Sequence, residues 1–121
     1  MRTVFQDTES NVNDDTIILR REPPSFAYLF WTNGVLRGDS VMLTAAGSTI
    51  GRRADAEVVL DDPAVSAEQA RVRLEDGEWW LYDLAATNRT AVDDAPVTRH
   101  RLSDNDRVIF GETTMVFRLV H

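Results

Sequence analysis

The chain has 121 residues, 43% of them hydrophobic and 27% charged, which is enough for one domain of ordinary size with its own core. Its formal net charge of −7 argues against general binding to nucleic acid, because such proteins usually present a basic face. The chain has no cysteine, which excludes disulfides and thiolate metal sites, and its 13 basic residues are all arginine, which excludes chemistry that needs a lysine.

Residues 1–25 differ in composition from the rest of the chain. They are rich in Asp, Glu, Asn, Ser and Thr, contain one short apolar run at residues 17–19, and end in Pro23-Pro24. Such a segment buries little surface, so we predict a disordered acidic tail over residues 1–25 and a folded domain over residues 26–121. No secretion signal is recognisable, and no apolar run approaches the roughly 20 residues of a membrane span. We therefore expect a cytoplasmic protein without membrane contact.

From Phe26 onward, short β-prone segments alternate with polar turns. Turn signals such as Asn33-Gly34 and Asp76-Gly77 separate them. Trp79 and Trp80 are adjacent, so in a strand they face opposite sides and one of them belongs to the core. No window has a sustained helical period, and many short strands favour an all-β sandwich or barrel. The segments with strand character are residues 27–31, 41–43, 48–50, 58–60, 70–74, 78–83, 107–110 and 113–120.

Three loop segments contain small polar residues and arginine where an ordinary turn would accept any hydrophilic residue. They are Gly51-Arg52-Arg53, residues 66–70 (SAEQA) and residues 83–90 (DLAATNRT). Their order and spacing resemble the signature of the forkhead-associated (FHA) domain family, which has Gly-Arg, Ser-Arg-x-His and Asp-Leu-x-Ser-x-Asn-Gly-Thr segments. Residues 102–108 resemble the family's closing turn, so the similarity covers roughly residues 26–120. It implies a two-sheet β-sandwich of about eleven strands that binds phosphothreonine peptides at one loop-bearing end.

The resemblance also implies a role for individual positions. Arg52 and Ser66 would contact the phosphate, and Thr87 would help to close the pocket. Asn88 would hydrogen-bond the peptide backbone beside the phosphothreonine. Arg89 stands where the family has glycine, and from this departure we hypothesise that its guanidinium offers the phosphate a second cation. The residues expected to support these loops are Gly51, Gln69 and Thr90.

These residue types suit a phosphate ester on physical grounds as well. Near pH 7 the ester carries about −1.5 to −2 charges and three acceptor oxygens. Arginine meets two of those oxygens with a planar fork, and a serine hydroxyl supplies another donor. Such charge-assisted bonds contribute roughly 1.5–3 kcal/mol each. Three or four of them, after the cost of ordering, fit micromolar affinity, about −8 kcal/mol.

Several positions depart from the family pattern. The arginine and histidine of Ser-Arg-x-His are Ala67 and Gln69, and the second serine is Ala86. A glutamine amide can make hydrogen bonds similar to those of the histidine, but Glu68 adds a negative charge near the expected phosphate. If the turn at Arg89 required a positive φ, a side chain there would cost about 1–2 kcal/mol. An alternative interpretation is therefore a degenerate FHA domain that has lost phosphate binding and acts as an assembly scaffold.

We expect no enzymatic activity, no cofactor and no metal site. The only histidines are His100 and His121, and Ser66 has no histidine near it in the sequence, although pairing with His100 in space remains open. No nucleotide-binding loop or zinc motif is recognisable. The expected partners are a protein that contains phosphothreonine and the Ser/Thr kinase that modifies it.

The tail itself contains candidate ligands. We hypothesise that Thr16, or secondarily Thr8, is phosphorylated and then binds an FHA pocket; the alternative is a tail with incidental threonines. Thr16 follows two aspartates, and the third residue after it, which FHA domains often read, is Leu19. The segment from Thr16 to Phe26 spans at most about 33–36 Å, while a domain of this size measures roughly 30–40 Å. We therefore expect Thr16 to bind in trans, giving phosphorylation-dependent self-association, whereas Thr8 reaches the pocket of its own chain.

Overall fold

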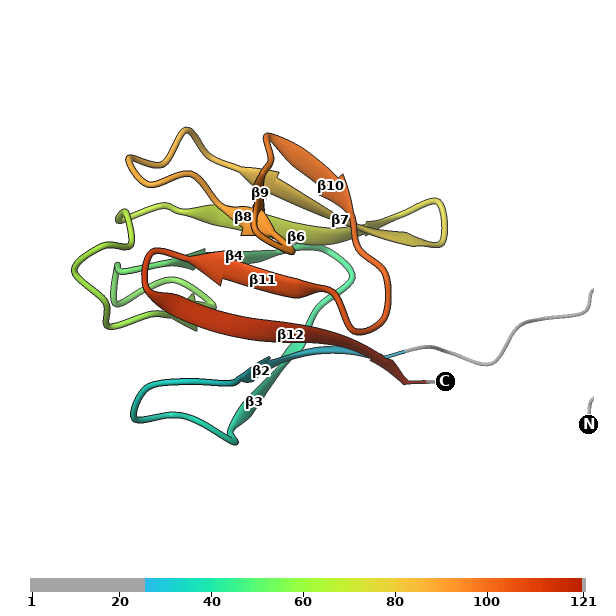
Figure 1. Cartoon of the computed structure of the whole chain (residues 1–121). Coiled ribbons are helices and arrows are strands. Elements are labelled where there is room, and N and C mark those ends of the chain that lie inside the picture. The colour runs from blue at the N-terminus through green and yellow to red at the C-terminus, as the bar shows by residue number, and fades with distance from the viewer. Residues whose placement is uncertain (1–25, 121) are drawn as a thin grey trace, which may run out of the picture.

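The computed structural model describes residues 26–120, which form two β-sheets (Figure 1). The five-stranded sheet has the order β10-β7-β6-β4-β5 and the six-stranded sheet the order β3-β2-β12-β11-β8-β9. The predicted all-β sandwich of about eleven strands is thus confirmed. No helix within these residues has the length and apolarity needed to cross a bilayer. The strands are β2 (Phe26–Trp31), β3 (Ser40–Leu43), β4 (Ser48–Gly51), β5 (Val58–Val59), β6 (Ala70–Glu75), β7 (Glu78–Asp83), β8 (Ala91–Val92), β9 (Ala95–Pro96), β10 (Arg99–Arg101), β11 (Arg107–Phe110) and β12 (Thr113–Val120).

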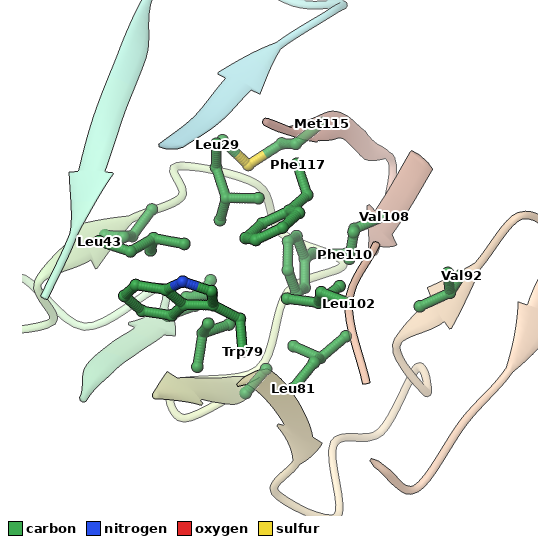
Figure 2. Packing of buried hydrophobic residues seen from close by; sticks show 14 of the residues in the cluster. Leu29, Leu43, Trp79, Leu81, Val92, Leu102, Val108, Phe110, Met115 and Phe117 are labelled. Atoms are coloured by element: carbon green, nitrogen blue, oxygen red, sulfur yellow. The ribbon is translucent and has the colours of Figure 1, made fainter. Parts of the chain in front are cut away.

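The core lies between the sheets because alternate residues of the longer strands are apolar. Figure 2 shows Leu29 and Phe117 from the six-stranded sheet close to one another, with Leu81 of the five-stranded sheet in the same cluster. Trp79 is 5% exposed and belongs to this core, although its indole nitrogen has no hydrogen-bond partner. Trp80 lies on the outer face, where the guanidinium carbon of Arg99 is 5.3 Å from the ring centroid. The two tryptophans therefore divide between the faces as predicted.

Two details differ from the sequence prediction. The alternation of residues does not predict β8, β9 and β10, which have only two or three residues each. The segment Asn33-Gly34 suggests a tight hairpin, and β2 and β3 are indeed antiparallel neighbours, but residues 32–39 connect them. Gly38 closes this longer connection with a φ of 94°, and its amide donates to the carbonyl of Trp31 at 2.9 Å.

The connections that carry the three sequence motifs lie at one end of the sandwich (Figure 1). These are residues 52–57, 60–69 and 84–90, and the β2–β3 connection and the β11–β12 turn lie at the same end. β2 begins and β12 ends at the opposite end. Thr8, Thr16 and the predicted tail at residues 1–25 lie outside the described residues, as does His121.

Candidate functional site

β4 ends at Gly51, where the chain passes very close to the β5–β6 connection. A Cβ atom at this position would lie 2.1 Å from the carbonyl oxygen of Ala67, so only glycine fits. Gly51 is not among the residues with positive φ, so the close approach is what requires glycine here. Because the two segments meet so closely, the amide of Arg52 donates to the carbonyl of Ser66 at 3.0 Å. Gly51 thus holds Arg52 against the β5–β6 connection.

The side chain of Arg52 is fixed at one of its three nitrogens. Its Nε donates to the carbonyl of Val65 at 2.9 Å. The two terminal nitrogens make no hydrogen bond or ion pair with any residue between 26 and 120. Arg52 lines an open cavity of about 370 Å³ together with Ser66, Thr87 and Asn88. Its guanidinium is therefore oriented by the fold and retains four N–H donors for a ligand.

Two hydrogen bonds join the loops that meet in this cavity. The Oγ of Ser66 accepts a hydrogen bond from the amide of Thr87 at 3.0 Å, so the serine hydroxyl hydrogen can still be donated to a ligand. The Nδ2 of Asn88 donates to the carbonyl of Ala64 at 2.9 Å. This bond orients the carboxamide and leaves Oδ1 as an acceptor with no partner in the described chain. The cavity thus combines a cation, a hydroxyl donor and an amide acceptor.

Gln69 connects the same loops from behind. Its side chain is fully buried, and its Nε2 donates to the carbonyl of Asn88 at 2.8 Å and to Oγ1 of Thr90 at 3.1 Å. Its Oε1 accepts a hydrogen bond from the amide of Ser66 at 3.0 Å. Because both ends of the amide are used, Gln69 braces two of the residues that line the cavity without lining it itself.

Asp83 shapes the β7–β8 connection, a role that the sequence analysis did not assign. Its carboxylate accepts hydrogen bonds from the amides of Ala86 at 3.2 Å and Thr90 at 3.0 Å. Within this connection Ala85 has a φ of 58°, whereas Arg89 is not among the residues with positive φ. The backbone strain considered for Arg89 therefore falls on Ala85, four residues earlier. The sequence analysis identified Asp83 only as the first residue of the motif at residues 83–90, and nothing in that motif predicts its hydrogen bonds to the amides of Ala86 and Thr90.

Asp62 is a second residue whose role the sequence analysis missed. Its carboxylate accepts hydrogen bonds from the amides of Ala64 and Glu112 and from Oγ1 of Thr113, each at 2.8 Å. Burial to 8% exposure raises the pKa of Asp62, but these hydrogen bonds outweigh it and hold the pKa below its ordinary value. The ionised carboxylate thus ties the β5–β6 connection to the β11–β12 turn. In the sequence, Asp62-Pro63 indicated only a turn.

Two charged residues from the sequence analysis lie outside the cavity. Arg89 is exposed, does not line the cavity and makes no ion pair with a residue of the described chain. Glu68 lines a neighbouring cavity of about 300 Å³, where its carboxylate lies 3.3 Å from the guanidinium of Arg53. Arg53 also pairs with Asp55, so its single positive charge is shared between two carboxylates and compensates Glu68 only in part.

The structure does not bring Ser66 and His100 together as a pair. His100 Nε2 lies 3.1 Å from a carboxylate oxygen of Asp106, whereas the Ser66 hydroxyl contacts the Thr87 amide. Within residues 26–120, no three His, Asp or Glu side chains cluster in a way that could hold a metal ion. The described chain therefore offers the anion cavity at Arg52 as its candidate site.

Comparison with known proteins places this geometry in a family context. The model of the FHA domain matches residues 48–111. The glycogen accumulation regulator GarA of Mycobacterium tuberculosis is 35% identical over 95 residues, which are 78% of this chain and 59% of that protein. The chain thus spans about three fifths of the length of this relative.

Two solved structures are similar as well. One comes from a structural and functional analysis of phosphothreonine-dependent FHA domain interactions, with 31% identity and a TM-score of 0.72 over 77% of this chain and 95% of that one. The other is M. tuberculosis EmbR in complex with a low-affinity phosphopeptide, with 26% identity and a TM-score of 0.72 over 78% of this chain and 24% of that one.

Proposed function

This chain belongs to the FHA domain family, and we propose that it is a phosphothreonine-dependent interaction module in Ser/Thr kinase signalling. The observation that carries the proposal is the cavity at which Arg52, Ser66, Thr87 and Asn88 meet with hydrogen-bonding capacity unused by the described chain. The two similar structures support it, because one was studied for phosphothreonine-dependent interactions and the other contains a phosphopeptide.

Each side chain of the cavity has a distinct part in this proposal. The terminal nitrogens of Arg52 bind two phosphate oxygens, and the hydroxyl of Ser66 donates to a third. Thr87 closes the pocket beside them, and Oδ1 of Asn88 accepts a hydrogen bond from a peptide amide of the ligand. Charge-assisted bonds of about 1.5–3 kcal/mol each are sufficient for micromolar binding once ordering costs are subtracted. Gly51, Gln69 and Thr90 keep these groups in position.

We propose a binding role and not a catalytic one, in the cytoplasm, with no cofactor. The ligand is a phosphothreonine in a partner protein, and a Ser/Thr kinase controls binding by creating it. The Ser66 hydroxyl contacts a backbone amide and no base, which suits a hydrogen-bond donor better than a nucleophile. The alternative, a degenerate domain that acts as a scaffold, predicts that no phosphopeptide binds.

Titration with a library of phosphothreonine peptides tests the proposal. We expect the natural sequence to bind its preferred peptides with micromolar affinity and to ignore the same peptides without phosphate. Arg52→Ala removes the cation that meets the phosphate and should weaken binding at least about 100-fold. Arg89→Ala tests the second cation and, because Arg89 does not line the cavity, should cost less than about fivefold.

Arg101→Ala is the matched control for these variants. It removes one positive charge on β10, where Arg101 forms an exposed ion pair with Glu78 at 3.1 Å, and should leave affinity unchanged. Absence of phosphate-dependent binding in the natural sequence would contradict the proposal and favour the scaffold.

A further inference from the structure

We call the cavity lined by Arg52, Ser66, Thr87 and Asn88 the phosphate cavity. A second cavity adjoins it at the same end of the sandwich. It has a volume of about 270 Å³, and Pro63 lines both cavities. The apolar side chains of its lining include Trp31, Val35, Leu36 and Leu60. We call this cavity, with Asp61 and Glu112 at its edge, the acidic groove. In Figure 1 the β2–β3 connection, which provides Val35 and Leu36, lies at the same end as the β11–β12 turn, which provides Glu112.

The chemistry of the acidic groove is unlike that of the phosphate cavity. Val35 is fully exposed and Leu36 is 40% exposed, so two apolar side chains of one loop face water here. The carboxylates of Asp61 and Glu112 are exposed and make no hydrogen bond or ion pair with a residue in the described part of the chain. No arginine or histidine lines the groove. The groove thus favours a ligand that is both apolar and cationic, whereas Arg52 on the other side of Pro63 favours an anion.

The walls of the acidic groove are tied together by the fold. The Nδ2 of Asn33 donates to the carbonyl of Glu112 at 3.0 Å, and its Oδ1 accepts a hydrogen bond from the amide of Thr114 at 3.0 Å. Asp62 joins the opposite wall to the same turn through the amide of Glu112 and the hydroxyl of Thr113. Three connections far apart in the sequence therefore form one preorganised surface, which lowers the ordering cost of binding.

We propose that the acidic groove binds the segment that flanks the phosphothreonine in the partner, and that it takes a large apolar side chain adjacent to a lysine or arginine. The inference rests on the proposed function, because the phosphate is what brings this segment to the groove. Two arguments identify the occupant: Pro63 lines both cavities, so the groove lies directly beside the phosphate cavity, and its uncompensated carboxylates complement a basic residue. An acidic flank would be repelled, so the groove also adds selectivity.

An oriented library in which phosphothreonine is fixed and the flanking positions are random tests this inference. The natural sequence should enrich an apolar residue next to a basic one at a single distance from the phosphothreonine. Asp61→Arg and, independently, Glu112→Arg place a positive charge at the groove edge. Each should abolish the preference for the basic residue and weaken the best peptide about five- to tenfold, while a peptide with glutamate at that position gains affinity.

Glu78→Arg is the matched control. It makes the same change in net charge at the first residue of β7, at the other end of the sandwich, where it also removes the exposed ion pair with Arg101, and should leave the selected sequences unchanged (Figure 1). If phosphopeptides bind but no flanking preference depends on Asp61 or Glu112, the inference is wrong and the proposed function stands. If no phosphopeptide binds at all, both are wrong.

Sedimentation of the same variants tests whether the occupant of the groove is instead a second copy of the chain. If Asp61→Arg disrupts an association between copies of the chain and leaves peptide selection intact, the groove is a contact between copies and the inference is overturned.

Discussion

The side chain of Gln69 braces the loops of the phosphate cavity by hydrogen bonds. The FHA pattern has histidine at this position, and the buried amide of glutamine makes three hydrogen bonds, to Ser66, Asn88 and Thr90. Two of those partners line the cavity, so the orientation of the ligand-binding groups depends on a residue that no ligand touches. The departure at Gln69 is therefore compatible with ordered binding loops.

Gln69→Leu tests this dependence. Leucine fills a similar volume but leaves the amide of Ser66 and the carbonyl of Asn88 without their partners, so we expect the free energy of unfolding to fall by about 2–3 kcal/mol. Phosphopeptide affinity should also fall several-fold, although Gln69 does not line the cavity. Urea denaturation and peptide titration measure the two effects. Gln69→His is the conservative control and should retain most of the affinity; equal affinity of Gln69→Leu and the natural sequence would contradict the bracing role.

The β5–β6 connection and the β11–β12 turn depend on each other through one ionised side chain. Asp62 accepts hydrogen bonds from both, and the connection it fixes contains Pro63, which lines the phosphate cavity and the acidic groove alike. The connection is thereby anchored to the turn by hydrogen bonds from Glu112 and Thr113. The same contact makes the stability of this end of the sandwich depend on pH.

We expect Asp62→Asn to lower the free energy of unfolding by about 2 kcal/mol at pH 7, because the charged acceptor is lost. The pKa of Asp62 is depressed in the folded state, so the stability it contributes is fully present above the unfolded value near 4. That contribution is lost as the pH falls through the lower folded pKa. Denaturation of both proteins between pH 7 and pH 3 should therefore show their difference shrinking only in acid; a difference independent of pH would contradict the assignment.

The longer strands could be predicted from the sequence, whereas the short ones could not. Strands such as β6, β7 and β12 have enough residues for alternation to be recognised. By contrast, β8 and β9 have two residues each, too few for alternation to be recognised. They are defined by their pairing, β8 with β11 and β9 with β8. Resemblance to a family supplied the site residues near Arg52. The contacts of Asp62 and Asn33 join positions 50 to 81 apart in the sequence, and no local pattern indicates them.

The arrangement of the sandwich separates its binding end from the ends of its terminal strands. The loops around Arg52 lie at one end, and β2 begins at the other (Figure 1). A ligand joined to the start of β2 must therefore traverse most of the domain to reach the cavity of its own chain. This geometry supports the proposal that phosphorylated Thr16 binds a second copy. In the sequence the acidic flank of Thr16, Asp14-Asp15, lies on its N-terminal side. On its C-terminal side Leu19 is adjacent to Arg20, the combination that the acidic groove would accept.

We expect the chain phosphorylated at Thr16 to form dimers or longer assemblies whose size increases with protein concentration. Arg52→Ala should remain monomeric after the same treatment, because it lacks the phosphate-binding cation, and Thr16→Ala should not respond to the kinase. Analytical ultracentrifugation with mass spectrometry of the modified site gives both the size and the extent of phosphorylation. A monomer with Thr16 fully phosphorylated, at concentrations well above micromolar, would rule out binding in trans.

Glutamine at position 69 also affects how recognition responds to acidity. Among the described residues that line or brace the phosphate cavity there is no histidine, the side chain whose ordinary pKa lies between pH 5 and 8. A phosphate ester does so within that range, with a second ionisation near 6. In the proposed complex the change between dianion and monoanion would therefore occur on the phosphate of the ligand. Binding would then follow the charge of the ligand as the pH changes.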